Sequence, residues 1–171
     1  MEAVLSLEEL SARIPEPGKD IRLNLKFVLD NTSLTREQAL GVALACAFNQ
    51  KNHELVQVYR DMLQDPAIVQ DAQSAAALMA MNNVFYRFRH MVGDSEYEAL
   101  PARLRMQKLA NPTNKINLEL FSLAVSAING CENCIKSHEQ VLLGHGISKQ
   151  NILDAVRIAA TVRAADVALS L

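Results

Sequence analysis

Aromatic and chain-breaking residues are both scarce in this sequence. Its 171 residues include no Trp, five Phe, three Tyr, six Gly and five Pro. No segment alternates apolar and polar residues with the β-branched side chains that strands favour. The pattern therefore argues against a sheet, while a hydrophobic content of 50% is enough to build one helical core. We predict an all-α protein that forms a single domain over residues 1–171.

The sequence also lacks an excess of charge of one sign. Its formal net charge is −2, and its Lys and Arg residues are scattered, which argues against nucleic-acid binding. The segment from Met1 to Ile14 has no basic start followed by an apolar run, as a secretory signal would. No apolar run approaches the ~20 residues that cross a bilayer. We expect a cytoplasmic protein whose partners include neither nucleic acid nor a membrane.

Cysteine is rare, and its placement is uneven. Three cysteines in a reducing compartment do not make a disulfide framework, so a closely spaced pair is expected to be catalytic or metal-binding. Cys131 and Cys134 are such a pair. Cys46 lies in the apolar run from Val42 to Phe48 and is predicted to be a small, inert core residue.

Apolar periodicity and capping residues predict helices throughout the chain. A short helix begins at Ser6 and ends before Pro15. Further helices are expected over 21–29, 36–50 (capped by Thr35), 54–63, 66–91 (opened by Asp65 and Pro66), 101–109, 117–129, 131–143 and 148–169. The wide apolar face of the longest suggests burial on more than one side. Arg87, Arg89 and His90 form a polar end to this helix or, alternatively, part of a site or subunit contact.

A weak internal repeat appears at an offset of 80 residues. Four residues recur, namely Ala47, Asn49, Ala75 and Ala80 in the first copy and Ala127, Asn129, Ala155 and Ala160 in the second. The order of two helices and a long third helix recurs as well. We predict a repeat over 35–92 and 115–171, with the paired cysteines only in the second copy. The small side chains leave little apolar surface per helix, so oligomerisation would supply the missing burial.

The paired cysteines stand beside a base and a carboxylate. Gly130 is expected to end one helix, which puts Cys131 at the start of the next and His138 one turn beyond Cys134 on the same face. The helix N-terminus and the imidazole both favour a thiolate. In an antiparallel hairpin, Glu119 approaches His138. We predict a relay in which Glu119 orients His138, His138 takes a proton, and Cys134 is the nucleophile.

Other interpretations of the dithiol remain open at this point. A zinc site could use both cysteines and His138, with Cys46 as the only other thiol. The pair could also be an inert buried dithiol. A thioredoxin motif is excluded more firmly, because that motif belongs to a βαβ unit. His53 and His145 fall in predicted turns and are expected to be solvated.

Glu119, Cys131-x-x-Cys134 and His138 together resemble the E-x(11)-CxxC-x(3)-H signature of the alkyl hydroperoxidase D (AhpD) family, in the carboxymuconolactone decarboxylase-like superfamily. The segment Met81-Asn82-Asn83-Val84-Phe85-Tyr86-Arg87-Phe88 is similar too. The resemblance implies an AhpD-like fold of two related helical halves, a homotrimer, and peroxidase activity. It also implies that peroxide oxidises Cys134 and that Cys131 resolves the product as a disulfide. A branch of the family has His where this chain has Asn133.

The resemblance further implies how the dithiol is reduced. We expect this chain to bind no cofactor or metal. Family members take electrons from an external dithiol on a lipoyl-bearing acyltransferase and can pass them to a peroxiredoxin. The leading hypothesis is a thiol-dependent alkyl hydroperoxide reductase with an antioxidant role. The alternatives are a dithiol-disulfide oxidoreductase that passes electrons to a peroxiredoxin or another protein, and a non-enzymatic helical zinc-binding or scaffold protein.

Overall fold

The computed structural model describes residues 5–171, and all the regular elements in them are helices. Its helices are α1 (Leu7–Ala12), α2 (Lys19–Asp30), α3 (Arg36–Gln50), α4 (His53–Leu63), α5 (Pro66–Val92), α6 (Ser95–Ala99), α7 (Gln107–Ala110), α8 (Lys115–Asn129), α9 (Glu132–Gly144) and α10 (Lys149–Ala168), with a 3-10 turn at Glu16–Gly18. No strand occurs in the described residues, which confirms the all-α prediction. Residues 1–4, at the start of the segment judged to lack a secretory signal, lie outside the described residues.

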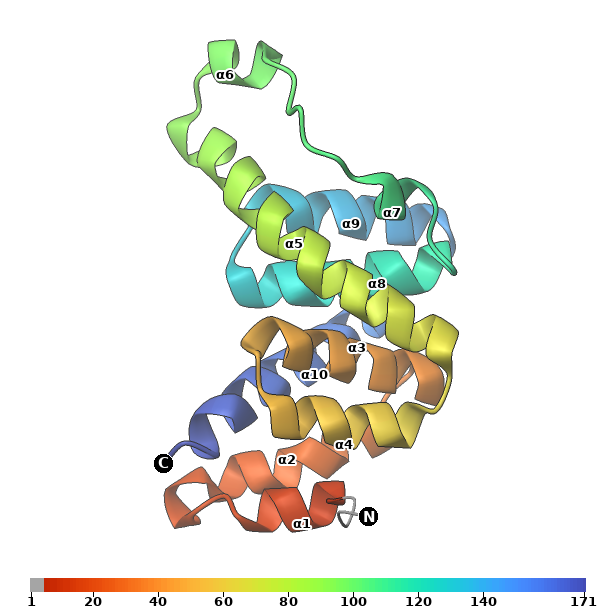
Figure 1. Ribbon diagram of the computed structural model, residues 1–171, viewed down its shortest axis with the longest axis vertical. Coiled ribbons are helices and arrows are strands. Elements are labelled where there is room, and N and C mark those ends of the chain that lie inside the picture. The colour runs from red at the N-terminus through yellow and green to blue at the C-terminus, as the bar shows by residue number, and fades with distance from the viewer. Residues whose placement is uncertain (1–4) are drawn as a thin grey trace.

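Two helices form the centre of the core. Residues 39–47 of α3 are all buried, as are Leu118 and residues 120–126 of α8. A Cβ atom on Gly41 would lie 2.2 Å from Cζ of Phe121, so the absence of a side chain at this position allows α3 and α8 to approach. Figure 1 shows both helices inside the bundle, with α5 crossing them.

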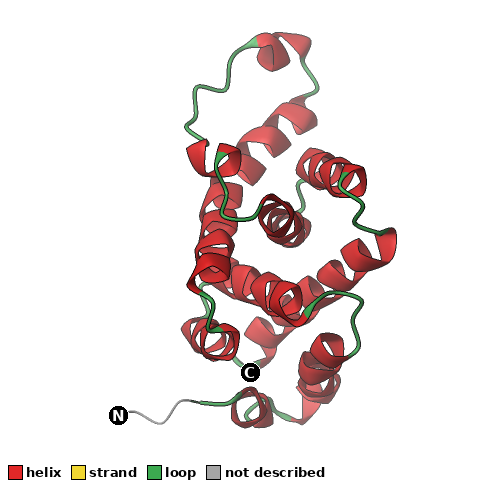
Figure 2. Ribbon diagram, turned by 90° about the vertical axis from the view of Figure 1, so that its right-hand side faces the viewer, coloured by secondary structure: helices red, strands yellow, loops and turns green. Residues whose placement is uncertain are grey.

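The remaining long helices surround this pair. The helix α5 packs against α3, α8 and α9, whereas α10 packs against α2, α3 and α8. Figure 2, turned by 90°, shows the helices packed into one body, from which the end of α5 and α6 project. The short helix α1 contacts α2 and α4 at the other end of the molecule. This frame fixes α5 opposite the α8–α9 turn, where the paired cysteines lie.

Two buried aspartates join the halves of the chain. Asp71 of α5 is 3% exposed and accepts hydrogen bonds from the backbone N–H groups of Thr113 and Asn114, at 3.1 and 3.0 Å, just before α8. Asp154 of α10 is 4% exposed and accepts the N–H and hydroxyl of Ser33, at 2.8 and 2.7 Å, shortly before α3. Each aspartate is the sixth residue of its helix. The two contacts are alike, but the aspartates lie 83 residues apart and so do not match at the 80-residue offset. The predicted repeat stays a prediction.

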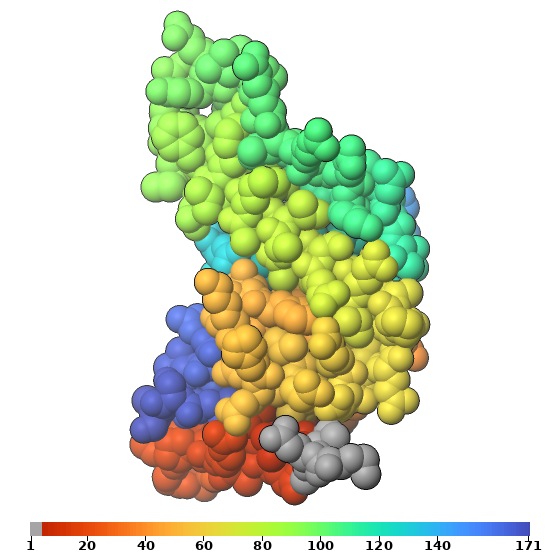
Figure 3. Space-filling view, viewed as in Figure 1, coloured from red at the N-terminus to blue at the C-terminus, as the bar shows by residue number. Residues whose placement is uncertain are grey.

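The sequence-based helix over 101–109 is wrong. The structure has two short helices, α6 and α7, with residues 100–106 outside any helix and Arg103 at a positive φ of 53°. Most side chains of 95–110 are exposed, so burial does not stabilise a helix of this length, which is marginal by itself. The space-filling view in Figure 3 shows the part around α6 projecting from the body, whereas the part around α7 lies against it.

Burial of α5 on more than one side is also wrong for its last turns. Val84, Phe88 and Met91 are 60%, 48% and 76% exposed, because this end of α5 extends past the helices that cover its beginning. Every other predicted helix begins and ends within two residues of its predicted bounds. Thr35 caps α3 as expected, in a capping box with Gln38. Within residues 5–171 no helix combines the length and the apolar character needed to cross a bilayer.

Candidate active site

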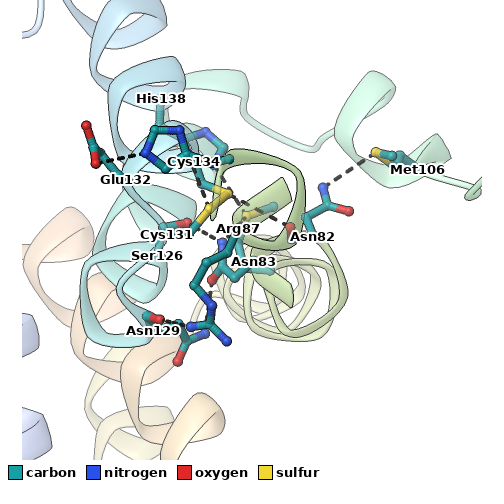
Figure 4. The surroundings of a disulfide bond; sticks show 12 residues. Asn82, Asn83, Arg87, Met106, Ser126, Asn129, Cys131, Glu132, Cys134 and His138 are labelled. Atoms are coloured by element: carbon teal, nitrogen blue, oxygen red, sulfur yellow. Dashed lines mark hydrogen bonds and ion pairs between the residues drawn. A yellow bond between two sulfur atoms is a disulfide. The ribbon is translucent and has the colours of Figure 1, made fainter. Parts of the chain in front are cut away.

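The paired cysteines lie where α8 turns into α9. Gly130 ends α8 with a left-handed φ of 69°, a conformation that favours glycine. Cys131 is the N-cap of α9, and its Sγ accepts a hydrogen bond from the N–H of Cys134 at 3.4 Å. A disulfide joins Cys131 and Cys134. The predicted placement of both cysteines at a helix start is confirmed, and Figure 4 shows the disulfide facing α5.

The two sulfurs differ in access. Cys131 is completely buried, whereas Cys134 is 7% exposed and lines a cavity of about 430 Å³. Cys134 Sγ also lies 3.9 Å from the backbone carbonyl oxygen of Asn82 on α5. The cavity is lined, besides Cys134, by Met79, Asn82, Tyr86, Met106, Leu109, Glu119, Asn133, Ser137, His138 and Val141. A small molecule in this cavity would therefore reach Cys134 before Cys131.

The predicted approach of Glu119 to His138 is confirmed. Glu119 Oε2 lies 2.7 Å from His138 Nδ1, and the two side chains are only 18% and 12% exposed. The carboxylate accepts a hydrogen bond from the Nδ1–H group and fixes the orientation of the ring. The other nitrogen, Nε2, lies 3.3 Å from Met79 Sδ. Among residues 5–171 no hydrogen bond joins His138 to either cysteine in this oxidised state, so proton transfer from Cys134 stays a prediction.

A polar network holds the end of α8 against α5. Asn83 donates from Nδ2 to Ser126 Oγ at 2.9 Å, and its Oδ1 accepts from Asn129 Nδ2 at 3.0 Å. Arg87 donates to the backbone carbonyl of Asn129. Because Asn129 comes two residues before Cys131, these contacts fix the turn that carries the dithiol.

A second contact braces the same turn from its exposed side. Glu132 lies 3.0 Å from His90 of α5 and 2.5 Å from Lys136 of α9. The hydrogen bond from Lys136 and then that from His90 hold the pKa of Glu132 below its ordinary value. Arg89 donates to the carbonyl of Leu100 instead. The polar end of α5 thus makes contacts within the chain, two of them beside the dithiol.

The other sequence candidates lie away from this cavity. Cys46 is completely buried in α3, as predicted, and burial raises the pKa of its thiol well above the ordinary value. His53 and His145 are exposed, although His53 begins α4 rather than lying in a turn. Cys46 therefore does not join the pair as a zinc ligand, and the part of the chain described here brings no three His, Cys, Asp or Glu side chains together as metal ligands.

Sequence reasoning missed most of the residues that line the cavity, including the two on α5 that lie beside His138 and Cys134. Met79 and Asn82 line the cavity, but both belong to the apolar-periodic stretch of the long helix, where Met is typical of a core. The signal available was the Asn82-Asn83 pair on the buried side of that helix, since buried polar residues need partners.

Comparison with known proteins places these observations in a family. Residues 95–171 match the model of the carboxymuconolactone decarboxylase family. The chain is 52% identical to "Alkyl hydroperoxide reductase AhpD" of Anaeromyxobacter dehalogenans strain 2CP-C, over 97% of this chain and 91% of that protein. Proteins of the same name are 45% identical in Streptomyces griseus, over 96% of both chains, and 44% identical in Rhodopseudomonas palustris strain BisB18, over 96% of this chain and 93% of that protein. Since identity of this level extends along nearly the whole sequence, the chain belongs to the AhpD family of the carboxymuconolactone decarboxylase-like superfamily.

Proposed function

We propose that this chain is a thiol-dependent alkyl hydroperoxide reductase, the activity for which its relatives are named. The observation that carries the proposal is the asymmetry of the disulfide. Cys134 lines a cavity of about 430 Å³ next to the Glu119–His138 pair, whereas Cys131 is completely buried behind it. This arrangement supports Cys134 as the sulfur that meets the peroxide and Cys131 as the sulfur that resolves the product.

The chemistry begins with the reduced dithiol. Glu119 holds His138, which removes the proton of Cys134. The thiolate attacks the terminal oxygen of the hydroperoxide, so that an S–O bond forms, the O–O bond breaks, and the departing oxygen takes the proton from His138 to give an alcohol. Cys131 then attacks the sulfenic acid on Cys134 and releases water, leaving a disulfide between the two residues. The disulfide in the structure corresponds to this product.

Two electrons from an external dithiol would restore the reduced state, without a bound cofactor. Because only Cys134 of the pair lines the cavity, a reductant entering there would attack Cys134 and release the Cys131 thiol. A lipoyl group on a carrier protein is a dithiol of this kind, and a peroxiredoxin is the expected protein partner in the same electron pathway. Membership of the AhpD family supports both partners, and the access route supports reduction by a small dithiol at Cys134.

We propose in addition that the chain assembles as a homotrimer. The projecting end of α5 with α6 exposes large apolar side chains, among them Val84 at 60%, Met91 at 76% and Leu100 at 59%. Exposed apolar surface of this kind marks an interaction site. Light scattering at micromolar concentration measures the assembly, and a stable monomer would contradict it.

The activity can be tested by measuring the intact mass of the reduced chain before and after it reacts with a hydroperoxide. One equivalent of cumene hydroperoxide should lower the mass by about two daltons, as two thiols become a disulfide, and release one equivalent of the alcohol. The Cys134→Ser variant is the control and should release no alcohol. Peroxide consumption that occurs only after a peroxiredoxin is added would instead favour a dithiol-disulfide oxidoreductase.

A further inference from the structure

Two adjacent asparagines on α5 differ in how their amides are satisfied. Asn82 and Asn83 are both buried, at 5% and 1% exposure. Asn83 donates to Ser126 at 2.9 Å and accepts from Asn129 at 3.0 Å, so its amide is paired at both ends. Asn82 donates only to Met106 Sδ, at 3.5 Å. Its Oδ1 is fully buried, and among residues 5–171 it has no hydrogen-bond partner. Hydrogen bonds within the chain therefore compensate for burying the Asn83 amide but not for burying the Asn82 amide.

The unpaired oxygen of Asn82 belongs to the residue beside the reactive sulfur. Asn82 lines the same cavity as Cys134, and its backbone oxygen lies 3.9 Å from Cys134 Sγ. Figure 4 shows the Asn82 amide turned towards Met106, while Asn83 faces Ser126 and Asn129. A buried acceptor without a partner destabilises a fold, so its presence here points to a ligand that supplies the missing donor.

We propose that the Asn82 carboxamide binds the hydroperoxide group of the substrate, an inference that rests on the proposed function. A hydroperoxide carries one O–H, on the terminal oxygen that the thiolate attacks. When the substrate binds, the Asn82 side chain turns from Met106 into the cavity, where its Oδ1 accepts this O–H and fixes the attacked oxygen towards Cys134. Asn82 Nδ2, whose present partner is a weak thioether acceptor, donates to the second oxygen.

This contact strengthens as the reaction proceeds. When the S–O bond forms and the O–O bond breaks, sulfur is oxidised and the second oxygen leaves as an alkoxide. The Asn82 N–H stabilises this negative charge until the proton held by His138 reaches the oxygen. The apolar part of the cavity, formed by Tyr86, Leu109 and Val141 among others, would cover the organic group. Asn82 thus acts on a hydroperoxide and not on the thiolate itself.

The test separates binding of peroxide from reactivity of the thiol. Stopped-flow measurement gives the rate at which cumene hydroperoxide oxidises the reduced enzyme, and a parallel assay gives alkylation of Cys134 by iodoacetamide, which has no hydroperoxide group. Asn82→Leu, nearly equal in volume to the parent, should slow the peroxide reaction about tenfold or more, which is the size of effect expected when a hydrogen bond is lost. Alkylation should stay within about twofold, because the Glu119–His138 pair remains.

Thermal unfolding provides the matched control. Asn82→Leu removes an unpaired polar atom and should unfold at the same temperature as the parent or higher, whereas Asn83→Leu breaks two hydrogen bonds and should unfold lower. Asn82→Ala repeats the kinetic test should leucine overpack the cavity. An unchanged peroxide rate in both Asn82 variants overturns the inference, as does an equal loss in both assays. A parent enzyme that consumes no hydroperoxide overturns the proposed function itself.

Discussion

Asn49 and Asn129 bind each other through both of their side-chain amides, at 3.0 and 3.1 Å, across a sequence separation of 80 residues. They are also a matched pair in the predicted repeat. A residue can bind its own counterpart only near an axis that relates the two copies. The contact therefore supports the repeat and places the ends of α3 and α8 together.

Truncation of Asn129 should destabilise the fold. Asn129→Ala leaves the side chain of Asn49 and the Oδ1 of Asn83 without a partner in a partly buried network, which should cost about 1–3 kcal/mol of the free energy of unfolding. Urea denaturation measures the change. Gln73→Ala, on the exposed side of α5, is the control and should stay within about 0.5 kcal/mol of the parent. Equal stability of the two variants would show that solvent replaces the network.

Glu119 and His138 should act as one unit in catalysis. Glu119→Gln and His138→Ala should each slow peroxide reduction by about 10²- to 10⁴-fold, the range for lost general-base catalysis. Because both changes interrupt one relay, the double variant should be little slower than the slower single variant. Stopped-flow kinetics on the three variants measures this, with Glu139→Gln on the same helix as the control. If the rate losses of the two single variants multiplied in the double variant, or if Glu119→Gln kept full activity, the Glu119 carboxylate would have no part in the relay.

The reduced cysteines should differ in reactivity towards a small alkylating reagent. Cys134 lines the cavity and has His138 one turn away, while Cys131 is completely buried. A short iodoacetamide pulse at pH 7, followed by peptide mapping, should label Cys134 first. Preferential labelling of Cys131 would move the nucleophile to the N-cap position.

Asp154 should make stability depend on pH in the acid range. Burial by itself would raise the pKa of this carboxyl, but hydrogen bonds from Ser33, Arg157 and Gln150 lower the pKa below its ordinary value. A carboxyl with a lowered folded-state pKa contributes stability that is complete above its unfolded pKa of about 4 and is lost as the pH falls towards the folded value.

The Asp154→Asn variant tests this dependence. It should be less stable than the parent by about 1–3 kcal/mol at pH 7, and the difference should shrink below about pH 4. Urea denaturation at several pH values measures the difference, and Asp20→Asn, an exposed first-turn aspartate, is the control. A difference that does not change with pH would assign the effect of Asp154 to shape and not to charge.

Much of the fold could be predicted because local signals agree with burial. Thr35 and Gly130 mark helix ends through their own capping chemistry, and the spacing of Cys134 and His138 on one helix face is independent of the rest of the chain. The approach of Glu119 to His138 needed only the assumption of an antiparallel hairpin.

The sequence did not reveal what depends on packing between distant segments. Whether Val84 and Phe88 are covered depends on how far α5 extends past its neighbours. Helical periodicity in the sequence carries no information about this extension. Most side chains of the segment 101–109 are exposed, so although Met106 and Leu109 line the cavity, little burial supports one continuous helix there. Asn82 and Asn83 look alike in sequence, and only the position of Ser126 and Asn129 distinguishes them.

The hydrogen bonds of Asp71 and Asp154 limit how this chain can be shortened. Each aspartate accepts hydrogen bonds from N–H groups shortly before a helix of the opposite half. Neither half therefore contains all the hydrogen-bond acceptors that the starts of its own helices use. The half without the paired cysteines contributes no thiol to the disulfide, yet its removal would deprive Asp154 of Ser33 and the N–H groups of Thr113 and Asn114 of Asp71. Residues 95–171, the segment that matches a family model, are therefore not a minimal enzyme.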